Sequence, residues 1–318
     1  MDLARKRILV TGGAGFLGTY VVKKLAESGC DPGDIRVPRS RATDLRLWEN
    51  CTNAVRDMDI VIHLAGKGGG IGFNQKYPGS IVYDNVVMGA QLMEAARQAG
   101  VSKFVMIGTV CSYPKFLPVP FKEEDLWNGY PEETNAPYGL SKKILLVQGK
   151  AYRDEYSFNA IHLLLVNMYG PRDDFSPERS HAIPALIRRM AEAKVSGNKE
   201  IVLWGTGKPS REFLYVEDAA EGICQATRLY DGAEPVNLGS GSEITIKDLA
   251  TQISTLIGFK GTIAWDTTKP DGQPRRSLDT SRAQQEFGFK AKTSLVDGLK
   301  KTIEWYQGQV AKGPILNA

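Results

Sequence analysis

A glycine-rich loop near the N-terminus constrains the fold of this chain more than any other feature. Residues 12–18 read G-G-A-G-F-L-G, with glycines three residues apart, between an apolar run at residues 7–10 and a helical pattern. Gly12 permits a tight turn, Gly15 lets the backbone approach a pyrophosphate, and Gly18 lets helix and strand pack closely. The N-terminus of the following helix would present free N–H groups to an anion. The loop therefore predicts a dinucleotide-binding unit, with a glycine-rich turn that binds no ligand as the alternative.

Strand and helix patterns alternate after this loop. Strand-like runs fall at residues 34–37, 59–64, 104–107 and 160–166, and helical spacing of apolar residues falls at 85–99 and 138–152. This alternation predicts an α/β fold with a Rossmann-type, doubly wound parallel sheet. After Gly170 the chain becomes richer in turn residues. We therefore expect a cofactor-binding Rossmann domain at residues 1–166 plus about 215–240, and a smaller, partly discontinuous α/β substrate-binding domain at 167–214 plus 241–318.

Composition and charge exclude several classes of protein. A content of 42% hydrophobic residues rules out a disordered chain, and four widely spaced cysteines fit no zinc-binding pair. The net charge is only +4, so we expect no nucleic-acid partner. No apolar stretch approaches the ~20 residues that span a bilayer, and the first apolar run is too short for a signal peptide. We expect a cytoplasmic protein with reduced cysteines, no membrane partner and no metal site.

The segment after the second expected strand bears on the choice of dinucleotide. NAD sites usually carry an acidic residue there, but this chain has Arg36, Arg39 and Arg41. A guanidinium can pair bidentately with a ribose 2′-phosphate, so the segment favours NADP(H), with NAD still possible. The arginines could also form only a solvated loop. Asp44 and Leu45 could frame the adenine.

Tyr138 and Lys142 form a Y-x-x-x-K motif within a helical pattern. Residues four apart share one helix face, so the Lys142 ammonium would lie near the Tyr138 hydroxyl. There it would lower the pKa of the phenol and could bind the nicotinamide ribose. Thr109 ends an earlier strand and is placed to donate a hydrogen bond to a substrate oxygen beside Tyr138. It could instead be only a β-branched strand residue.

With these motifs the chain resembles the extended short-chain dehydrogenase/reductase family over essentially its whole length. The family binds NAD(P), acts mostly on nucleotide-activated sugars, and carries a triad that maps onto Thr109, Tyr138 and Lys142. For His63, in a family-like strand end, we expect a structural role. Besides Tyr138 and Lys142, the expected cofactor-binding residues are Gly12, Gly15, Phe16, Leu17, Gly18, Arg39, Asp44, Leu45, Leu64, Ala65 and Gly66.

Further blocks make the chain most similar to the GDP-L-fucose synthase branch. The Asp-Glu pair of sugar 4,6-dehydratases is absent after Thr109, and simple 4-epimerases need neither a cysteine here nor a paired histidine. The similar blocks occur at residues 67–71, 83–85, 108–115, 167–171, 180–186, 204–207, 211–214 and 269–272. The resemblance implies a homodimer that inverts C3″ and C5″ of a GDP-4-keto-6-deoxyhexose and reduces the C4″ ketone with NADPH.

The resemblance also assigns Cys111 and His181 as the acid/base pair for epimerisation. C–H bonds that flank a ketone are acidic, and the enolate charge would form beside Thr109 and Tyr138. A thiol and an imidazole, with reference pKa values of ~8.5 and ~6.5, suit proton exchange near neutrality. Cys111 could alternatively be a small buried residue, and His181 a capping or core histidine.

Four further residues are implied as substrate ligands: Asn167, Arg189, Trp204 and Arg211. Trp204 could also belong to the core, and Arg189 to a solvated helix face. Thr109 and Val110 stand where the branch usually has serines, which leaves open the exact sugar and whether both epimerisation and reduction occur. Two other functions compete: a nucleotide-sugar epimerase on another hexose or heptose without net reduction, and a non-catalytic NADP-binding protein. The retained triad and acid/base pair disfavour the second.

Overall fold

Parallel strands form the main sheet of the computed structural model, which describes residues 1–269 and 271–311. Their order is β2 (Ile35–Arg36), β1 (Ile8–Thr11), β3 (Ile60–His63), β4 (Lys103–Thr109), β5 (Ala160–Leu165) and β9 (Val236–Leu238). Every neighbouring pair is parallel, which confirms the expected Rossmann-type α/β class. Pro270, which belongs to one similar block, and residues 312–318 of the expected second domain lie outside the described residues.

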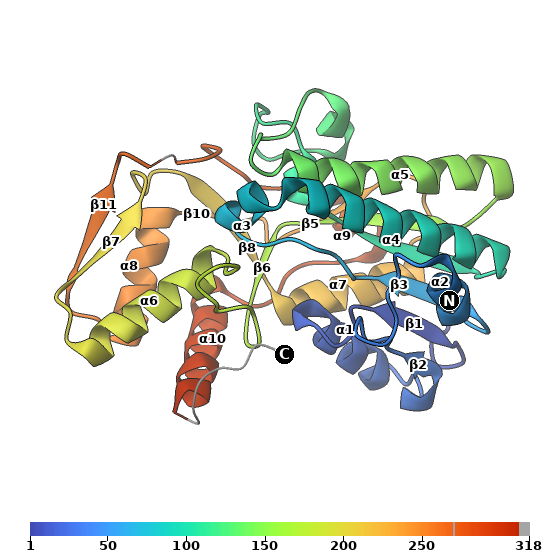
Figure 1. Cartoon of the computed structure of the whole chain (residues 1–318), viewed down its shortest axis with the longest axis horizontal. Coiled ribbons are helices and arrows are strands. Elements are labelled where there is room, and N and C mark those ends of the chain that lie inside the picture. The colour runs from blue at the N-terminus through green and yellow to red at the C-terminus, as the bar shows by residue number, and fades with distance from the viewer. Residues whose placement is uncertain (270, 312–318) are drawn as a thin grey trace.

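The central strands are buried along their whole length because helices cover both faces of the sheet. One face packs against α2 (Trp48–Val55), α4 (Pro78–Gln98) and α5 (Ala136–Tyr156), and the other against α1 (Phe16–Glu27), α7 (Val216–Leu229) and α9 (Ser281–Phe287) (Figure 1). This layering explains the nearly continuous apolar runs of β4 and β5.

Two elements differ from the expected boundaries for local reasons. The second strand is shorter than residues 34–37, since Pro38 closely follows it and has no N–H to donate. Helix α4 begins at Pro78 rather than at residue 85, because a proline in the first turn suits a helix start even where the apolar spacing is weak.

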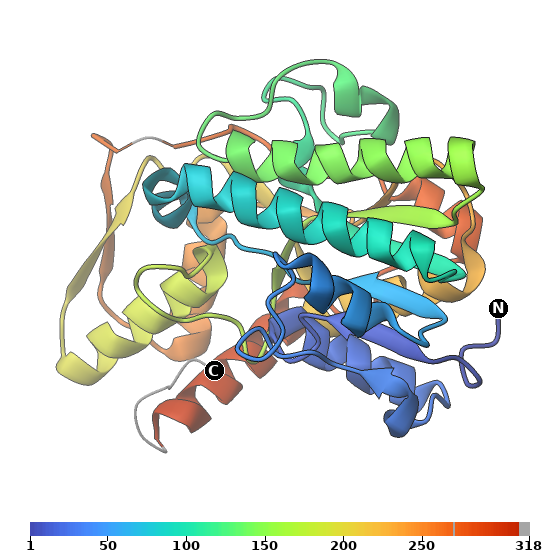
Figure 2. The ribbon, with the colours of Figure 1, turned by 45° about the vertical axis from the view of Figure 1, so that its right-hand side comes forward.

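A second unit has its own hydrophobic core. It contains a sheet of β6 (Asn167–Tyr169), β8 (Ser210–Tyr215) and β10 (Glu243–Thr245), a pair formed by β7 (Glu200–Trp204) and β11 (Thr262–Asp266), and helices α6 (Ala182–Ser196), α8 (Ile246–Ile257) and α10 (Leu295–Val310). Figures 1 and 2 show this unit beside the main sheet. The short helices are α3 (Ile71–Lys76), η1 (Pro32–Asp34), η2 (Val110–Ser112) and η3 (Glu123–Trp127).

Packing differs from the expected domain boundaries at α9. This helix falls within residues 241–318, but Ala283 and Phe287 are buried in the core of the main sheet. The chain segment that carries α9 returns to the main sheet, and the helix packs beside β9 there. The division into two domains otherwise remains a proposal.

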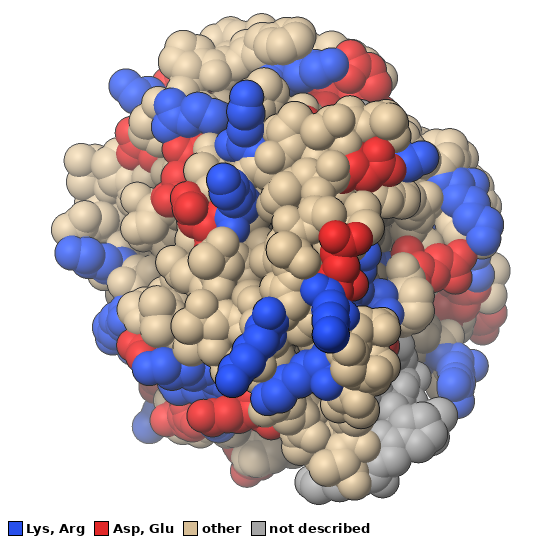
Figure 3. Space-filling view, turned by 90° about the vertical axis from the view of Figure 1, so that its left-hand side faces the viewer, with Lys and Arg blue, Asp and Glu red and all other residues tan. Residues whose placement is uncertain are grey.

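The surface of the second unit mixes charges of both signs. Figure 3 shows lysine and arginine side chains interspersed with acidic ones on this face. Among the described helices, none combines the length and apolar character needed to cross a membrane.

The strand order reverses between β1 and β3. The chain passes from β1 to β2 on one side and returns to β3 on the other. Doubly wound sheets bind ligands beyond the carboxyl ends of the strands at this point. Here those ends are Thr11, before the glycine loop, and His63, before Leu64 and Ala65.

Candidate active site

The glycine loop joins β1 to α1 through contacts that exclude side chains. Gly12 has a φ of +70°, and a Cβ there would lie 2.8 Å from the Ala65 nitrogen. A Cβ at Gly18 would lie 2.1 Å from the Gly12 oxygen. Gly15 precedes the helix as its N-cap without a side-chain cap, and the first turn holds no acidic residue. The helix N-terminus therefore fits an anion such as a dinucleotide pyrophosphate.

His63 links the ends of β1 and β3. The side-chain oxygen of Thr11 lies 2.7 Å from His63 Nδ1, and the Ala65 N–H donates to the same oxygen at 3.3 Å. Complete burial, and then the charge of Lys142, lower the pKa of His63 to about 3. A neutral, buried imidazole that orders the loop after β3 fits the structural role expected for it.

Tyr138 and Lys142 lie on α5, with the Lys142 Nζ 6.0 Å from the centroid of the Tyr138 ring. A Cβ at Gly66 would lie 3.4 Å from Nζ, so the lysine borders the expected cofactor site. Burial lowers the pKa of Lys142 to about 8. Burial, followed by the charge of Cys111, raises the pKa of Tyr138. This direction is opposite to the expected effect of Lys142, because the cost of desolvating the phenolate dominates.

Thr109, Cys111 and Tyr138 meet where β4 ends and α5 begins. The Thr109 hydroxyl accepts a hydrogen bond from the Cys111 N–H at 3.2 Å and so caps the short helix η2. A Cβ at Gly139 would lie 2.2 Å from the Cys111 oxygen, so the first turn of α5 packs directly on this backbone. Cys111 is half-buried, which leaves its thiol partly accessible.

The glycine-rich loop between β3 and α3 contacts both α5 and the segment that carries His181. A Cβ at Gly68 would lie 3.4 Å from the Tyr138 ring, while the Gly70 N–H donates to the Arg179 oxygen at 3.0 Å. His181 is the N-cap residue of α6 but provides no side-chain cap. Its imidazole retains contact with solvent, although the surrounding protein desolvates it enough to lower its pKa.

Trp204 and Arg189 lie on the second unit. Trp204 is 67% exposed at the end of β7, which excludes a core role and leaves its ring free to stack on a base. Lys269 Nζ lies 5.8 Å from the centroid of this ring. Arg189 on α6 donates to the oxygen of Val202 and thus crosses from helix to strand.

Arg211 and Asn167 lie on adjacent strands, β8 and β6. Arg211 donates to the Ser210 oxygen at 2.7 Å, and burial, followed by the charge of Arg276, lowers its pKa to about 10. The Asn167 side chain donates to the main-chain oxygen of Glu212 at 3.4 Å. A partly buried, still cationic Arg211 is suited to bind a diphosphate.

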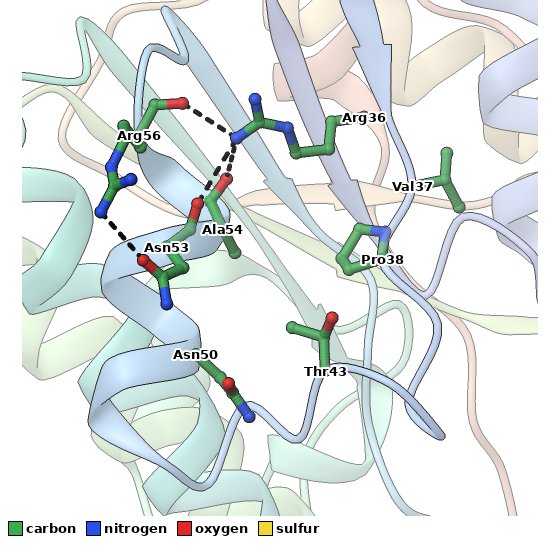
Figure 4. Close-up of a pocket in the computed structure, with 8 residues that line it drawn as sticks. All are labelled: Arg36, Val37, Pro38, Thr43, Asn50, Asn53, Ala54 and Arg56. Carbon is green, nitrogen blue, oxygen red and sulfur yellow. Dashed lines mark hydrogen bonds between the residues drawn. The ribbon is translucent and has the colours of Figure 1, made fainter.

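A pocket of about 510 Å³ lies between β2 and α2 (Figure 4). Arg36 lines it, but its Nη1 donates to the main-chain oxygens of three residues at the end of α2: Asn53, Ala54 and Arg56. This contact corrects the expectation that Arg36 is open to a 2′-phosphate, because the guanidinium caps the helix C-terminus instead. Arg39 and Arg41 lie in the exposed loop that follows β2.

Asp44, one of the two residues expected at the adenine, belongs to an ion-pair network. Arg46 binds Asp44 through both carboxylate oxygens and lowers the pKa of that carboxyl to about 2. Arg46 also reaches Asp84, which pairs with Lys67 at 2.8 Å. Sequence reasoning missed this network, since its members are far apart in the chain. Leu45 is buried in the core beside α2 and α4.

Arg276 is a further residue that sequence reasoning missed. Its Nη1 lies 3.4 Å from the Cys111 sulfur, although 165 positions separate the two residues. No local pattern distinguishes this arginine from its neighbour Arg275. Within residues 1–269 and 271–311, no cluster of histidine, cysteine or acidic residues is arranged to hold a metal ion.

Residues 8–239 match the model of the NAD dependent epimerase/dehydratase family. Together with the glycine loop, the switch point and the Tyr138–Lys142 pair, this match shows that the chain belongs to that family.

Within the family, the chain is similar to GDP-L-fucose synthases. It is 39% identical to GDP-L-fucose synthase 1 of Arabidopsis thaliana over 304 residues, which cover 94% of this chain and 93% of the relative. A GDP-L-fucose synthetase from Naegleria fowleri bound to NADP has a TM-score of 0.86 at 26% identity, covering 99% of this chain and 97% of that one. A GDP-6-OMe-4-keto-L-xylo-heptose reductase from C. jejuni has a TM-score of 0.90 at 25% identity, covering 96% and 99%.

Proposed function

We propose that this chain is an NADP(H)-dependent nucleotide-sugar 3,5-epimerase/4-reductase that acts on a GDP-4-keto-6-deoxyhexose, as its similarity to GDP-L-fucose synthases suggests. The observation that carries the proposal is the meeting of Thr109, Cys111 and Tyr138 at the end of β4. A half-accessible thiol beside a protonated phenol provides a base and an acid on one carbonyl-binding site.

The glycine loop fits the cofactor. Gly12 and Gly18 let β1, α1 and Ala65 pack closely, and Gly15 places no side chain at the N-terminus of α1. The N-terminus of α1 would hold the pyrophosphate, Lys142 the nicotinamide ribose, and Arg39 the 2′-phosphate. When bound, NADPH supplies the hydride for reduction of the ketone.

Epimerisation would use Cys111 and His181 on opposite faces of the sugar. Thr109 and Tyr138 donate hydrogen bonds to O4″ and so stabilise the enolate that forms when Cys111 removes a proton from C3″ or C5″. His181, which retains contact with solvent and takes a proton from it, then gives that proton to the carbon from the other face, which inverts the centre.

Reduction would use Tyr138 as the proton donor to O4″. Its raised pKa keeps the hydroxyl protonated before the ketone is reduced. Lys142, with a pKa of about 8, is close to neutrality and can resupply that proton.

Four side chains would bind the nucleotide sugar. Arg211 and Arg189 bind the diphosphate by their guanidinium groups, Trp204 stacks on the base, and Asn167 contacts the sugar. The exposed ring of Trp204 and the partly buried position of Arg211 support these roles.

We also propose that the protein is a homodimer and that it is cytoplasmic. Val82 and Tyr83 of α4 and Ile144 and Val147 of α5 expose apolar side chains on neighbouring helices. Such a patch supports self-association of the chain. The four unpaired thiols are typical of a reducing compartment and support a cytoplasmic location.

The test is incubation with NADPH and a panel of GDP-, UDP- and dTDP-linked 4-keto sugars in deuterated water. We expect NADPH oxidation and deuterium at C3″ and C5″ with the GDP-4-keto-6-deoxyhexose. The variant Cys111→Ser should lose the deuterium, because a hydroxyl is a far weaker base than a thiolate, whereas Cys224→Ser at a buried cysteine should not. Deuterium incorporation without NADPH oxidation would instead identify an epimerase without net reduction.

A further inference from the structure

Arg276 and Arg275 are adjacent in sequence but have opposite environments. Arg275 is exposed and forms an ion pair with Glu243. Arg276 is buried, and its Nη1 donates to the Cys111 sulfur at 3.4 Å. Its Nε and Nη2 donate to Gln273 Oε1 at 3.1 and 2.9 Å. None of these acceptors is a carboxylate.

A buried guanidinium that is satisfied only by neutral groups is costly, because its charge has left water. Gln273 supplies an amide oxygen but no negative charge. Of the groups that accept hydrogen bonds from Arg276, Cys111 is the one that can become an anion. A negative charge on the Cys111 sulfur would therefore lie directly against the Arg276 guanidinium.

The contact is held in place from both sides. Gln273 is buried and donates to the Lys115 oxygen at 2.8 Å, which connects it to the chain that follows η2. Cys111 is held by the hydrogen bond from its N–H to Thr109. The guanidinium thus has little freedom to leave the sulfur.

The other charged or titratable groups around Cys111 do not take its place beside Arg276. Tyr138 keeps its proton, since burial raises its pKa. Arg211 keeps its positive charge near neutrality, with a pKa of about 10. Glu132 is a buried carboxylate near Arg276: against the effect of burial, hydrogen bonds from Thr134 and Asn135, and after them the charge of Arg276, lower its pKa. Its hydrogen bonds come from Thr134 and Asn135, so Cys111 remains the acceptor of Arg276 that can carry a negative charge.

We propose that Arg276 is a positioning residue for epimerisation, which holds Cys111 as a thiolate and fixes the direction of its sulfur. The inference rests on the proposed function for its role in catalysis. In the step, the sulfur takes a proton from the carbon beside the C4″ ketone, and the C–H electron pair becomes the enolate. The thiol releases that proton to solvent before the next turnover, and Arg276 stabilises the thiolate that returns.

Alkylation of Cys111 tests the contact without any substrate. The probe is iodoacetamide, with the modified peptide identified by mass spectrometry, on the wild type, Arg276→Met and the control Arg275→Met. Thiolates react and thiols do not, so Arg276→Met should react about tenfold more slowly at neutral pH. Its rate should recover at higher pH, whereas Arg275→Met should match the wild type. An Arg276→Met rate and pH profile equal to the wild type would overturn the proposal.

A second variant covers the case in which Arg276→Met does not fold. Gln273→Glu keeps the size of the side chain and its hydrogen bonds to Arg276 but adds a competing negative charge. We expect alkylation of Cys111 to slow by roughly threefold or more. An unchanged or faster rate would count against a charge role for Arg276.

Solvent exchange separates this inference from the proposed function. With the GDP-4-keto sugar, Arg276→Met should lose most deuterium incorporation, and Arg276→Lys should recover part of it because the charge remains. Wild-type exchange in Arg276→Met would overturn the inference alone. Absence of exchange in the wild type would overturn the proposed epimerisation, while alkylation would still decide whether Arg276 holds a thiolate.

Discussion

At the scale of single residues, burial sets the protonation state of the groups proposed to handle protons. It raises the pKa of Tyr138, lowers that of Lys142 to about 8 and lowers that of His181. These directions favour a protonated phenol, an ammonium close to its titration range and a neutral imidazole. Each state follows from the cost of holding charge away from water.

Replacing Tyr138 with phenylalanine removes the proton donor and leaves the packing of the ring nearly unchanged. We expect NADPH-dependent reduction to fall by at least ~100-fold, the usual size of a general-acid contribution. The measurement is the rate of NADPH oxidation with the 4-keto sugar. Tyr156→Phe, at the exposed end of the same helix, is the control and should be as active as the wild type. Near-normal turnover of Tyr138→Phe would place the acid elsewhere.

Asp173 predicts a pH dependence of stability. It is buried after β6, and burial raises its carboxyl pKa from 3.8 to about 8. Between these values the folded chain keeps a proton that the unfolded chain has lost, so the free energy of unfolding falls as pH rises. Asp173→Asn should therefore gain thermal stability over the wild type as pH increases from about 5 to 8. The exposed control Asp154→Asn should show no such trend in thermal denaturation.

At the scale of elements, two arginines close in sequence, one on β2 and one in the loop after it, have different surroundings. Arg36 lies on β2 and donates to main-chain oxygens at the end of α2, where the helix carries partial negative charge. Arg39 follows in the exposed loop. The hydrogen bonds of α2 thus decide which arginine remains available to a phosphate.

This division of tasks predicts opposite phenotypes. Arg39→Ala should weaken NADPH by roughly tenfold and leave NADH nearly unchanged, because a guanidinium–phosphate pair is lost. Arg36→Ala should instead destabilise the fold by about 1 kcal/mol and change both affinities alike. Cofactor titration and thermal denaturation of both variants check this. Equal loss of both cofactors in Arg39→Ala would contradict it.

At the scale of the whole molecule, the exposed helices α4 and α5 bear on assembly. They lie side by side over one face of the main sheet (Figure 1). Ile144 and Val147 are about half exposed on α5, and Tyr83 is 60% exposed on α4. Burial of this patch against a second copy would remove apolar surface from water.

Introducing a charge into the patch should therefore dissociate the proposed homodimer. Val147→Glu should sediment as a monomer at concentrations where the wild type is dimeric, since an unpaired carboxylate would be buried at the interface. Val195→Glu on α6 is the control, because Val195 is 88% exposed and lies outside the patch. A monomeric wild type in sedimentation velocity would contradict the proposed homodimer.

The sequence by itself determined the features that local patterns encode. The spacing of Gly12, Gly15 and Gly18 after an apolar run predicts the β1–α1 turn, since backbone geometry there depends on neighbouring residues. Strand and helix periodicity likewise predicts the sheet class. The pairing of Tyr138 with Lys142 follows from helical spacing.

Tertiary structure decided what depends on contacts between distant parts of the chain. It placed Arg276 on Cys111, directed Arg36 to the end of α2, and brought α9 back to the main sheet. It also set the raised pKa of Tyr138, since the desolvation of a side chain depends on which distant segments cover it. Sequence spacing does not predict these contacts, because they form only when the chain folds.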